Sequence, residues 1–323
     1  MDVITVGSHG GPDVLTVTDQ PAPEPGEGQV RVAVEAAGIN YADIMQRRGL
    51  YPGGPEPPYI PGMEVAGRVN ATGPDVSISE GDRVIAMVDT GGYAEYALAD
   101  AMTLFPIPEE TSMVEAAAFP VQFLTAHACL FAWGGLEENE RVLIQAAAGG
   151  VGTAAVQLAD RAGAEVFGTA SKPEKLELAA ELGCDHPINY TEEDFVDIIE
   201  TETDGEGVDL VLESVGDDVF ERSFDALSHF GRLVTYGVAS GVPATVTNQR
   251  LLFENKSVHG FHLGQAAAHD PSRVMQSLTD LTGALASGEI EPIIGETFPL
   301  EAASEAHQFI EDRESVGKVI LEP

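Results

Sequence analysis

The sequence predicts an α/β fold built from an all-β, barrel-like domain and a doubly wound parallel sheet, on three observations. A length of 323 residues exceeds what a single hydrophobic core usually serves, so two domains are expected. Up to about Pro120, short strand patterns alternate with Gly and Pro turns. From about Val121 to His262, strand and helix patterns alternate, as a doubly wound sheet requires.

In the first part of the chain, the strand patterns are short and the turns are explicit. Residues 30–35 alternate between apolar and polar, and residues 65–69 and 83–87 predict a strand pair around the Gly81-Asp82 turn. Gly91 and Gly92 open a further strand. The proline-rich segment 51–58 has no regular pattern and predicts a loop.

A glycine turn at the start of the second part predicts a phosphate-binding loop. An apolar strand over 142–144 leads into the turn, and a helical pattern follows it. Such a turn directs free backbone N–H groups and the positive helix end at one point, where a pyrophosphate binds. The spacing Ala147-x-Gly149-x-x-Gly152 fits the dinucleotide fingerprint with alanine in place of its first glycine. We therefore expect the cofactor diphosphate at Ala148, Gly149, Gly150, Val151 and Gly152.

The end of the next strand indicates which nicotinamide cofactor is bound. Residues 164–169 lead into Ala170, Ser171 and Lys172 instead of an acidic residue. An acid there would bind a ribose diol, whereas hydroxyl and ammonium groups suit a 2′-phosphate. Two of the four lysines, Lys172 and Lys175, lie in this segment, which favours NADPH over NADH. The alternative is that both are solvated residues of the helix beginning near Pro173.

The remaining pattern predicts about six strands and the helices between them. Strands are expected over 187–190, 208–213, 231–237 and 258–261, and helices over 176–182, 195–199 and 219–227. Ligands of such sheets bind at the carboxyl ends of the strands. The residues placed there, which should line the cofactor groove, are Ser214, Val215, Tyr236, Gly237, Phe261 and His262. For His262, as for His127, we expect a structural role and no catalytic one.

Composition limits the function classes. The chain carries 53 acidic against 16 basic residues, a net charge of −37 spread along its length, which excludes nucleic acid as a partner. This pattern resembles proteins of salt-loving archaea, whose self-repulsion is screened at molar salt. Two cysteines, Cys129 and Cys184, are too few for a disulfide framework or a four-cysteine zinc site. No signal peptide or membrane span is evident, so we expect a soluble, cytoplasmic protein.

Several motifs in order along the whole chain resemble those of zinc-free quinone reductases of the zeta-crystallin type, in the medium-chain dehydrogenase/reductase superfamily. The resemblance implies a GroES-like β-barrel catalytic domain formed by residues 1–121 and 263–323, with a helix near 273–286 and a strand over 318–321. It implies a Rossmann NADPH-binding domain over 122–262, and a homodimer paired through the last strand of that domain. The motifs are Ala37-Gly-Ile-Asn40-x-x-Asp43, Pro61-Gly-x-Glu64-x-Ala66-Gly67, Gly81-Asp82-x-Val84, Gly92-Tyr-Ala-Glu95, Ala146-Ala-Ala-Gly149-Gly-Val-Gly152 and Gly317-Lys318.

The chain departs from the zinc-containing relatives at three positions. Those relatives carry Cys, His and Cys where this chain has Asn40, Met63 and Val121. None of the three supplies a thiolate or imidazole, so we expect no catalytic zinc. Without a Lewis acid, a substrate that is already electron-poor is favoured, namely a quinone or an activated alkene.

We interpret the reaction as zinc-independent hydride transfer from NADPH to a quinone, with the protein supplying position and polarity. Asn40 is expected to donate a hydrogen bond to a substrate carbonyl oxygen as charge builds there. Tyr51 would cover or hydrogen-bond the substrate, and Asp43 would hold Asn40 or the nicotinamide in place.

The resemblance also implies cofactor contacts outside the glycine loop. Thr125 would contact the nicotinamide, and Tyr190 would lie near the adenosine phosphate, with a strand-end core aromatic as the alternative for Tyr190. Lys318 could reach a cofactor or substrate, or have no role. Met45 stands where some bacterial quinone reductases have tyrosine, so the pocket should be less polar.

Two alternative functions stay open: an NADPH-dependent alkenal, enone or enoyl-thioester reductase, and a non-catalytic NADPH-binding protein. The sequence does not identify the physiological acceptor, the number of electrons transferred at a time or the proton donor, nor does it separate a dimer from a tetramer.

Overall fold

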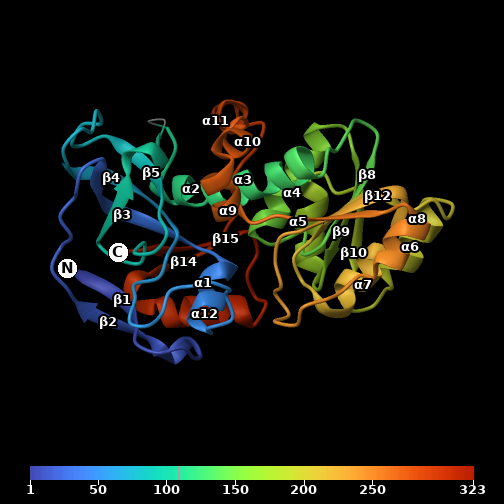
Figure 1. Ribbon diagram of the computed structural model, residues 1–323, viewed down its shortest axis with the longest axis horizontal. Helices are drawn as coiled ribbons and strands as arrows, with labels where there is room; N and C mark the ends of the chain where they lie inside the picture. Colours follow the sequence, from blue (N-terminus) through green and yellow to red (C-terminus); the bar gives the residue numbers. More distant parts are fainter. Residues whose placement is uncertain (108–109) are drawn as a thin grey trace. The chain divides into compact units, whose positions relative to one another are not determined.

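A computed structural model describes residues 1–107 and 110–323 of the chain (Figure 1). The chain forms two compact units, Met1–Val121 with Pro292–Pro323 (unit 1) and Gln122–Glu291 (unit 2). The expected fold class is confirmed, because unit 1 is built on a mainly antiparallel sheet, in which only β14 and β15 pair in parallel, and unit 2 on a parallel α/β sheet. None of the helices within 1–107 and 110–323 is both long and apolar enough to cross a membrane.

Unit 1 is organised around one long strand, β3 (Gln29–Ile39), which pairs with three neighbours. Its inward residues Val30, Val32 and Val34 are buried, so the alternation in the sequence matches the buried face. The sheet runs in the order β14 (Ile294–Pro299), β15 (Lys318–Glu322), β3, β4 (Glu64–Thr72), β5 (Arg83–Met87) and β7 (Leu104–Pro106), with β6 (Tyr96–Asp100) also on β3. A separate hairpin joins β1 (Asp2–Val6) and β2 (Leu15–Asp19).

The antiparallel pairing of β15 with β3 brings the end of the chain beside a strand near its beginning (Figure 1). Ile320 lies opposite Gly38, and Val319 opposite Ile39. The α-helices among the described residues of unit 1 are α1 (Tyr41–Arg47), which begins directly after β3, α2 (Met113–Ala117) and α12 (Ala303–Glu311). This arrangement places the start of α1 next to the start of β15.

Unit 2 contains the six strands expected from the sequence. Their order is β10 (His186–Asn189), β9 (Glu165–Ala170), β8 (Arg141–Ile144), β11 (Val208–Glu213), β12 (Leu227–Thr235) and β13 (Ser257–Gly260), and every neighbouring pair is parallel. The central residues of β8 are fully buried, as a strand covered on both faces requires. The strand order reverses at β8, because β9 lies on one side of it and β11 on the other. The carboxyl end of β8 is therefore the topological switch point.

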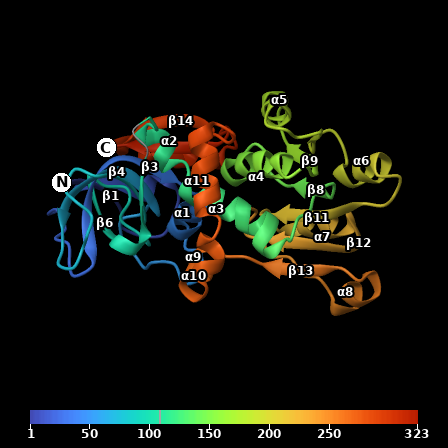
Figure 2. The ribbon, with the colours of Figure 1, turned by 90° about the horizontal axis from the view of Figure 1, so that it is seen from above.

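Figure 2 shows helices α4 to α7 around this sheet. The helices of unit 2 are α3 (Pro120–His127), which begins at the boundary with unit 1, α4 (Gly150–Arg161), α5 (Pro173–Glu181), α6 (Phe195–Glu202), α7 (Asp217–Asp225), α8 (Asn248–Glu254), α9 (Leu263–His269), α10 (Pro271–Met275) and α11 (Leu278–Ser287). Residues Ala128–Trp133 continue α3 as a π-helical turn.

The domain boundary differs from the expectation, because residues 263–291 belong to unit 2 and not to the catalytic domain. Side chains of α4 hold this segment. The Gln157 side chain bonds both the backbone N–H and the C=O of Glu291, at 2.8 and 3.0 Å, and Arg161 forms an ion pair with Asp280 at 2.8 Å. Only the segment with β14, α12 and β15 returns to unit 1.

The helix expected over 273–286 is also different, since it consists of two helices, α10 and α11. The break falls at Ser277, whose hydroxyl donates to the Val274 carbonyl. Such side-chain bonds to nearby backbone compete with continuation of a helix.

Candidate active site

The glycine loop lies between the carboxyl end of β8 and the start of α4. Gly149 is the N-cap residue, and α4 begins at Gly150, so the first turn presents backbone N–H groups that the helix itself cannot use. A Cβ at Gly152 would lie 2.1 Å from the Ala146 oxygen and 2.7 Å from the Ala147 carbonyl carbon, both backbone atoms. This is the close approach of helix to strand that the last glycine of a dinucleotide fingerprint permits.

Alanine at the first fingerprint position is accommodated by a glycine on the neighbouring strand. A Cβ at Gly168 of β9 would lie 2.9 Å from the Ala147 Cβ. Gly168 therefore leaves the space that the Ala147 side chain fills. The sequence pattern contained this compensation, but only the pairing of β8 with β9 shows which residue provides it.

Buried hydrogen bonds hold the glycine loop in place, and the sequence did not predict them. Thr169 donates to the Gln145 Oε1 at 2.6 Å, and Gln145 donates from Nε2 to Ser223 at 2.9 Å. The Ala147 N–H donates to the Thr169 carbonyl at 2.9 Å. Gln145, a polar residue at the end of an apolar run, was the available signal.

The residues expected at the 2′-phosphate lie together at the carboxyl end of β9. Ser171 and Lys172 follow the strand, and Lys172 is the N-cap residue of α5. Lys175, in the first turn of α5, is only 8% exposed. The Tyr190 N–H donates to the Ala170 carbonyl at 3.2 Å, and Tyr190 as a residue is 41% exposed. The alternative of a core aromatic for Tyr190 is therefore wrong, and its ring is accessible at this edge.

The expected residues after β11 and β12 are held together by a buried carboxylate, Glu213. Its Oε1 accepts hydrogen bonds from the N–H groups of Val215 and Gly216, at 2.5 and 2.7 Å. Burial raises the pKa of Glu213. A Cβ at Gly237 would lie 2.9 Å from the Ser214 oxygen, so these two turns are in contact. Glu213 was not among the expected site residues, although a charge at the end of an apolar strand marked it.

Three expected cofactor residues are placed differently from one another. Thr125 is 7% exposed on α3, and Phe261 is 6% exposed, with its ring centroid 4.8 Å from that of Trp133. Tyr236 is half-buried, and its N–H donates to the Glu213 carbonyl at 2.9 Å.

In unit 1, Asn40 lies in a cluster that the sequence did not reveal. Its Nδ2 donates to the Glu64 Oε1 at 2.8 Å, and its Oδ1 accepts from the Lys318 Nζ at 2.6 Å. Lys318 and Glu64 form an ion pair of 2.5 Å, with side chains only 3% and 0% exposed. Lys318, expected at the cofactor, thus has its described partners inside unit 1.

Asp43 lies directly beneath Asn40 and is fully buried. Its Oδ2 accepts from the Asn40 N–H at 2.8 Å and from the Tyr93 hydroxyl at 3.1 Å. Burial, the largest influence, raises the pKa of Asp43 to about 6. The expectation that Asp43 holds Asn40 therefore has a direct contact to support it.

The polar chain continues from Asp43 to α12. Tyr93 has one hydroxyl hydrogen, which it gives to Asp43, so the His307 Nε2 at 3.1 Å must donate to the Tyr93 oxygen. Burial and the neighbouring Arg47 lower the pKa of His307 to about 3, which keeps the imidazole neutral. Tyr51 is half-buried near this chain, and burial and then the charge of Asp43 raise its pKa.

The residues at the zinc position do not fit a zinc ion. Asn40 offers an amide oxygen that already accepts from Lys318, and the Glu64 carboxylate is paired with the same ammonium. The Met63 thioether accepts from Gln46 at 3.8 Å, and Val121 has no ligand atom in its side chain. Within residues 1–107 and 110–323, no three His, Cys, Asp or Glu side chains are arranged to hold a metal.

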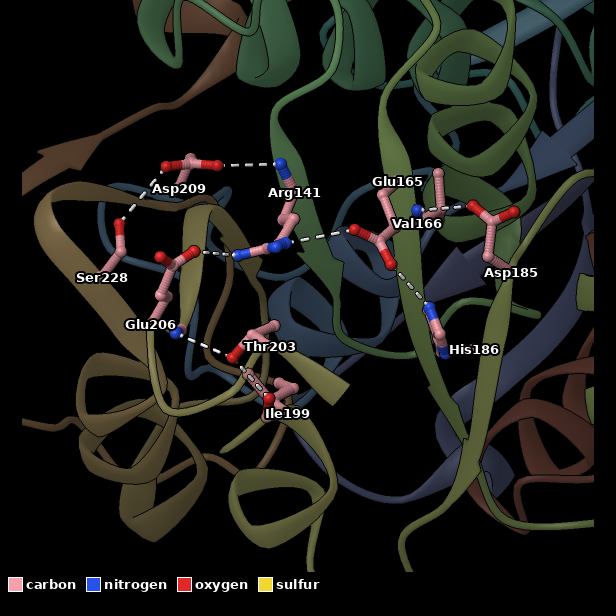
Figure 3. Close-up of polar contacts among 11 residues, drawn as sticks. Arg141, Glu165, Val166, Asp185, His186, Ile199, Thr203, Glu206, Asp209 and Ser228 are labelled. Atoms are coloured by element: carbon pink, nitrogen blue, oxygen red, sulfur yellow. Dashed lines mark hydrogen bonds and ion pairs between the residues drawn. The ribbon is translucent and has the colours of Figure 1, made fainter. Parts of the chain in front are cut away.

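The amino edge of the unit 2 sheet is filled by paired side chains (Figure 3). Arg141 bonds Glu165 and Glu206, and its N–H donates to Asp209; His186 bonds the other oxygen of Glu165. These groups bind one another at the amino ends of the strands, so we place the candidate cofactor site at the opposite, carboxyl ends.

Two surface hollows, of about 560 and 370 Å³, contain none of the expected site residues. One is lined by residues of β14, α12 and the short 3-10 helix η1 (Pro12–Val14), such as Phe298 and Phe309, and the other by α4 and its neighbours, including Arg161.

Two families match this chain by sequence. Residues 26–109 match the alcohol dehydrogenase GroES-like domain family, and residues 150–280 match the zinc-binding dehydrogenase family. A quinone oxidoreductase-like protein 2 homolog of Nematostella vectensis is 37% identical over 300 residues, which cover 92% of this chain and 82% of that protein. The rat synaptic vesicle membrane protein VAT-1 homolog is 37% identical over 340 residues, covering 99% and 83%.

Two solved structures resemble this chain over nearly its full length. The Escherichia coli quinone oxidoreductase, complexed with NADPH, has a TM-score of 0.94 at 33% identity, with 100% of each chain covered. The CurK enoyl reductase has a TM-score of 0.89 at 30% identity, covering 99% of this chain and 98% of that one.

Proposed function

Since this chain belongs to the quinone oxidoreductase-like family of the medium-chain dehydrogenase/reductase superfamily, we propose that it is an NADPH-dependent, zinc-independent reductase of quinones. The observation that carries the proposal is the glycine loop at the switch point of unit 2, next to a strand end with Ser171 and Lys172 in place of an acid. NADPH is bound by the Escherichia coli relative.

The cofactor would be held at the carboxyl edge of the unit 2 sheet. Backbone N–H groups of Gly150, Val151 and Gly152 would bind the diphosphate, and Ser171 and Lys172 the 2′-phosphate. The other residues proposed to contact it are Thr125, Ala148, Gly149, Lys175, Tyr190, Ser214, Val215, Tyr236, Gly237 and Phe261. When bound, NADPH supplies the hydride.

The acceptor would be recognised by unit 1. Asn40 uses one Nδ2 hydrogen for Glu64, so the second is available to a substrate oxygen on which negative charge develops. Tyr51, half-buried on the proline-rich loop, would contact the substrate ring. A quinone that gains a hydride and one proton from solvent becomes the hydroquinone, so no general acid of the protein is needed.

Zinc independence rests on the cation already present. The Lys318 ammonium donates to two oxygens of the cluster, Glu64 Oε1 and Asn40 Oδ1. We infer that this ammonium supplies the positive charge that a metal would otherwise bring to these two oxygens.

We also infer a homodimer formed through β13. This strand is at the edge of the sheet and has one unpaired side. Near it, Phe230 of β12 and Leu252 and Phe253 of α8 are exposed by 76%, 69% and 74%. Pairing of two β13 strands about a two-fold axis would cover the sheet edge and this apolar surface.

The test is oxidation of NADPH and NADH with a small benzoquinone and with a short enone, at molar salt and with chelator present. We expect chelator-resistant turnover that prefers NADPH and the quinone. Preference for the enone would establish the alkenal or enoyl reductase alternative, to which the CurK likeness points. NADPH binding without turnover of either acceptor would establish the non-catalytic alternative.

A matched pair of variants tests the 2′-phosphate site. Lys172→Ala removes a positive charge from the proposed site, whereas Arg68→Ala removes an exposed positive charge from unit 1. We expect only Lys172→Ala to raise the KM for NADPH, with little effect on the KM for NADH.

A further inference from the structure

The Lys318–Glu64 ion pair is built into the core of unit 1 from distant parts of the chain. Lys318 begins β15 and Glu64 begins β4, and both strands are neighbours of β3. A Cβ at Gly38 of β3 would lie 2.7 Å from the Glu64 Oε1 and 2.8 Å from the Lys318 Cε. Gly38 thus leaves the space that the pair occupies.

The carboxylate of Glu64 is used on both oxygens. Oε1 binds Lys318 and Asn40, and Oε2 accepts from the Val121 N–H at 2.9 Å. Glu64 is therefore held in one position by partners on three segments of the chain. Its Oε1, which binds Asn40, is fixed with it.

This pair permits only one orientation of the Asn40 amide. A carboxylate accepts hydrogen bonds and an ammonium donates them, so the amide nitrogen must lie toward Glu64 and the amide oxygen toward Lys318. A flip of the amide by 180° would place donor against donor and acceptor against acceptor. The ammonium at Oδ1 also polarises the amide, which strengthens Nδ2 as a donor.

We propose that Lys318 and Glu64 are positioning residues, whose buried ion pair fixes and polarises the Asn40 amide so that its second Nδ2 hydrogen serves the reduced oxygen of the acceptor. The inference rests on the proposed function, in which Asn40 is the group that touches the acceptor. It gives Lys318 a role in the acceptor step in place of a cofactor contact. The ion pair should affect kcat and leave the affinity for NADPH unchanged, because unit 2 binds NADPH.

The test uses the double variant Glu64→Gln/Lys318→Met, because a single substitution would leave one charge buried without its partner. The double variant removes both charges at similar volume. Its neutral Gln both donates and accepts, so it no longer selects one orientation of the amide. We expect kcat with benzoquinone to fall about tenfold or more, while the Kd for NADPH, measured by fluorescence, stays within about twofold of wild type.

A coupling experiment separates positioning from a merely structural role. In wild type, Asn40→Ala should lower kcat by roughly a hundredfold, the effect of removing an oxyanion donor. In the double-variant background, Asn40→Ala should lower kcat by a clearly smaller factor, because the amide that it removes is no longer aligned. Thermal unfolding, measured on all four proteins, reports whether each is folded at the assay temperature.

The outcomes distinguish the inference from the proposed function. Wild-type kcat in a folded double variant, or an Asn40→Ala effect equal in both backgrounds, overturns the inference and leaves the proposed function standing. Wild type that binds NADPH but reduces no acceptor overturns the proposed function and, with it, the inference. A loss of kcat that disappears once Asn40 is Ala confirms the positioning role.

Discussion

The buried carboxyl of Asp43 makes a quantitative prediction about stability and pH. Its pKa rises from 3.8 to about 6 in the fold, chiefly because of burial. The groups facing it are the Asn40 N–H, Lys318 and Tyr93, each of which lowers its pKa, and Glu64, which raises it. The perturbation we propose is Asp43→Asn, which keeps the size of the side chain and an oxygen acceptor but removes the ionisation.

The sign follows from the order of the two pKa values. Well below pH 3.8 the carboxyl is protonated in both folded and unfolded chains, so ionisation contributes nothing. Between pH 4 and about 6 the unfolded chain releases the proton and the folded chain keeps it, so the folded state loses stability as pH rises. Above about pH 6 the full cost is present, about 3 kcal/mol for a shift of about two pKa units.

The assay is denaturant unfolding at pH 4, 5, 6 and 7 with molar salt held constant. All other carboxylates titrate in both proteins, so the difference between Asp43→Asn and wild type isolates this group. We expect that difference in unfolding free energy to move by about 2.4 kcal/mol in favour of the variant between pH 4 and pH 7, because the carboxyl of the unfolded chain is already partly ionised at pH 4. The exposed Asp89→Asn is the control and should show no such movement. A difference for Asp43→Asn that stays constant across this range would refute the reasoning.

Three further predictions concern unit 2 and its surface. Gly152→Ala should destabilise the protein and abolish NADPH binding, because its Cβ would lie 2.1 Å from a backbone oxygen. Gly149→Ala, whose Cβ would have its nearest contact at 3.3 Å, should keep most of the stability and most of the NADPH affinity. Thermal unfolding and NADPH titration compare the two variants. Lys172→Ala should raise the KM for NADPH by about tenfold and leave that for NADH within about twofold, since one phosphate contact contributes about 1.4 kcal/mol; equal changes in both would remove Lys172 from the 2′-phosphate site. Phe253→Arg should convert the proposed dimer to a monomer by light scattering at fixed salt, whereas Met102→Arg, at an even more exposed position of unit 1, should not; a dimer that survives Phe253→Arg would place the interface elsewhere.

The sequence also predicted much of the fold correctly, where the determining interactions are local. The apolar run of β8, the glycines after it and the start of α4 lie within a dozen residues of one another. Strand and helix periodicity depends on which face of a segment is buried, and that pattern is written in consecutive residues. A doubly wound sheet of about six parallel strands could therefore be expected before any contact was known, whereas the strand order, and with it the switch point at β8, follows from the pairing.

For the rest of the candidate site, the sequence identified single residues but few of the contacts between them. Asn40 and Asp43 were named from a motif and Tyr51 from its place on the proline-rich loop. The contact of Asn40 with Asp43 is local enough to be expected from the N-cap position of Asn40. The boundary at residue 292 was not predictable, because it depends on Gln157 and Glu291, which are 134 positions apart.

What the sequence by itself determined is the type of fold, the place of the phosphate loop and the absence of thiolate and imidazole at the zinc position. What only the tertiary structure decided is the environment of Asn40. Lys318 is 278 positions from Asn40 in the chain and 2.6 Å from it in the fold, because β15 pairs with β3. A lysine near the end of a chain has no local pattern that names its partner. The partner is set by which strands become neighbours, and burial then makes the charges of Lys318 and Glu64 dependent on each other.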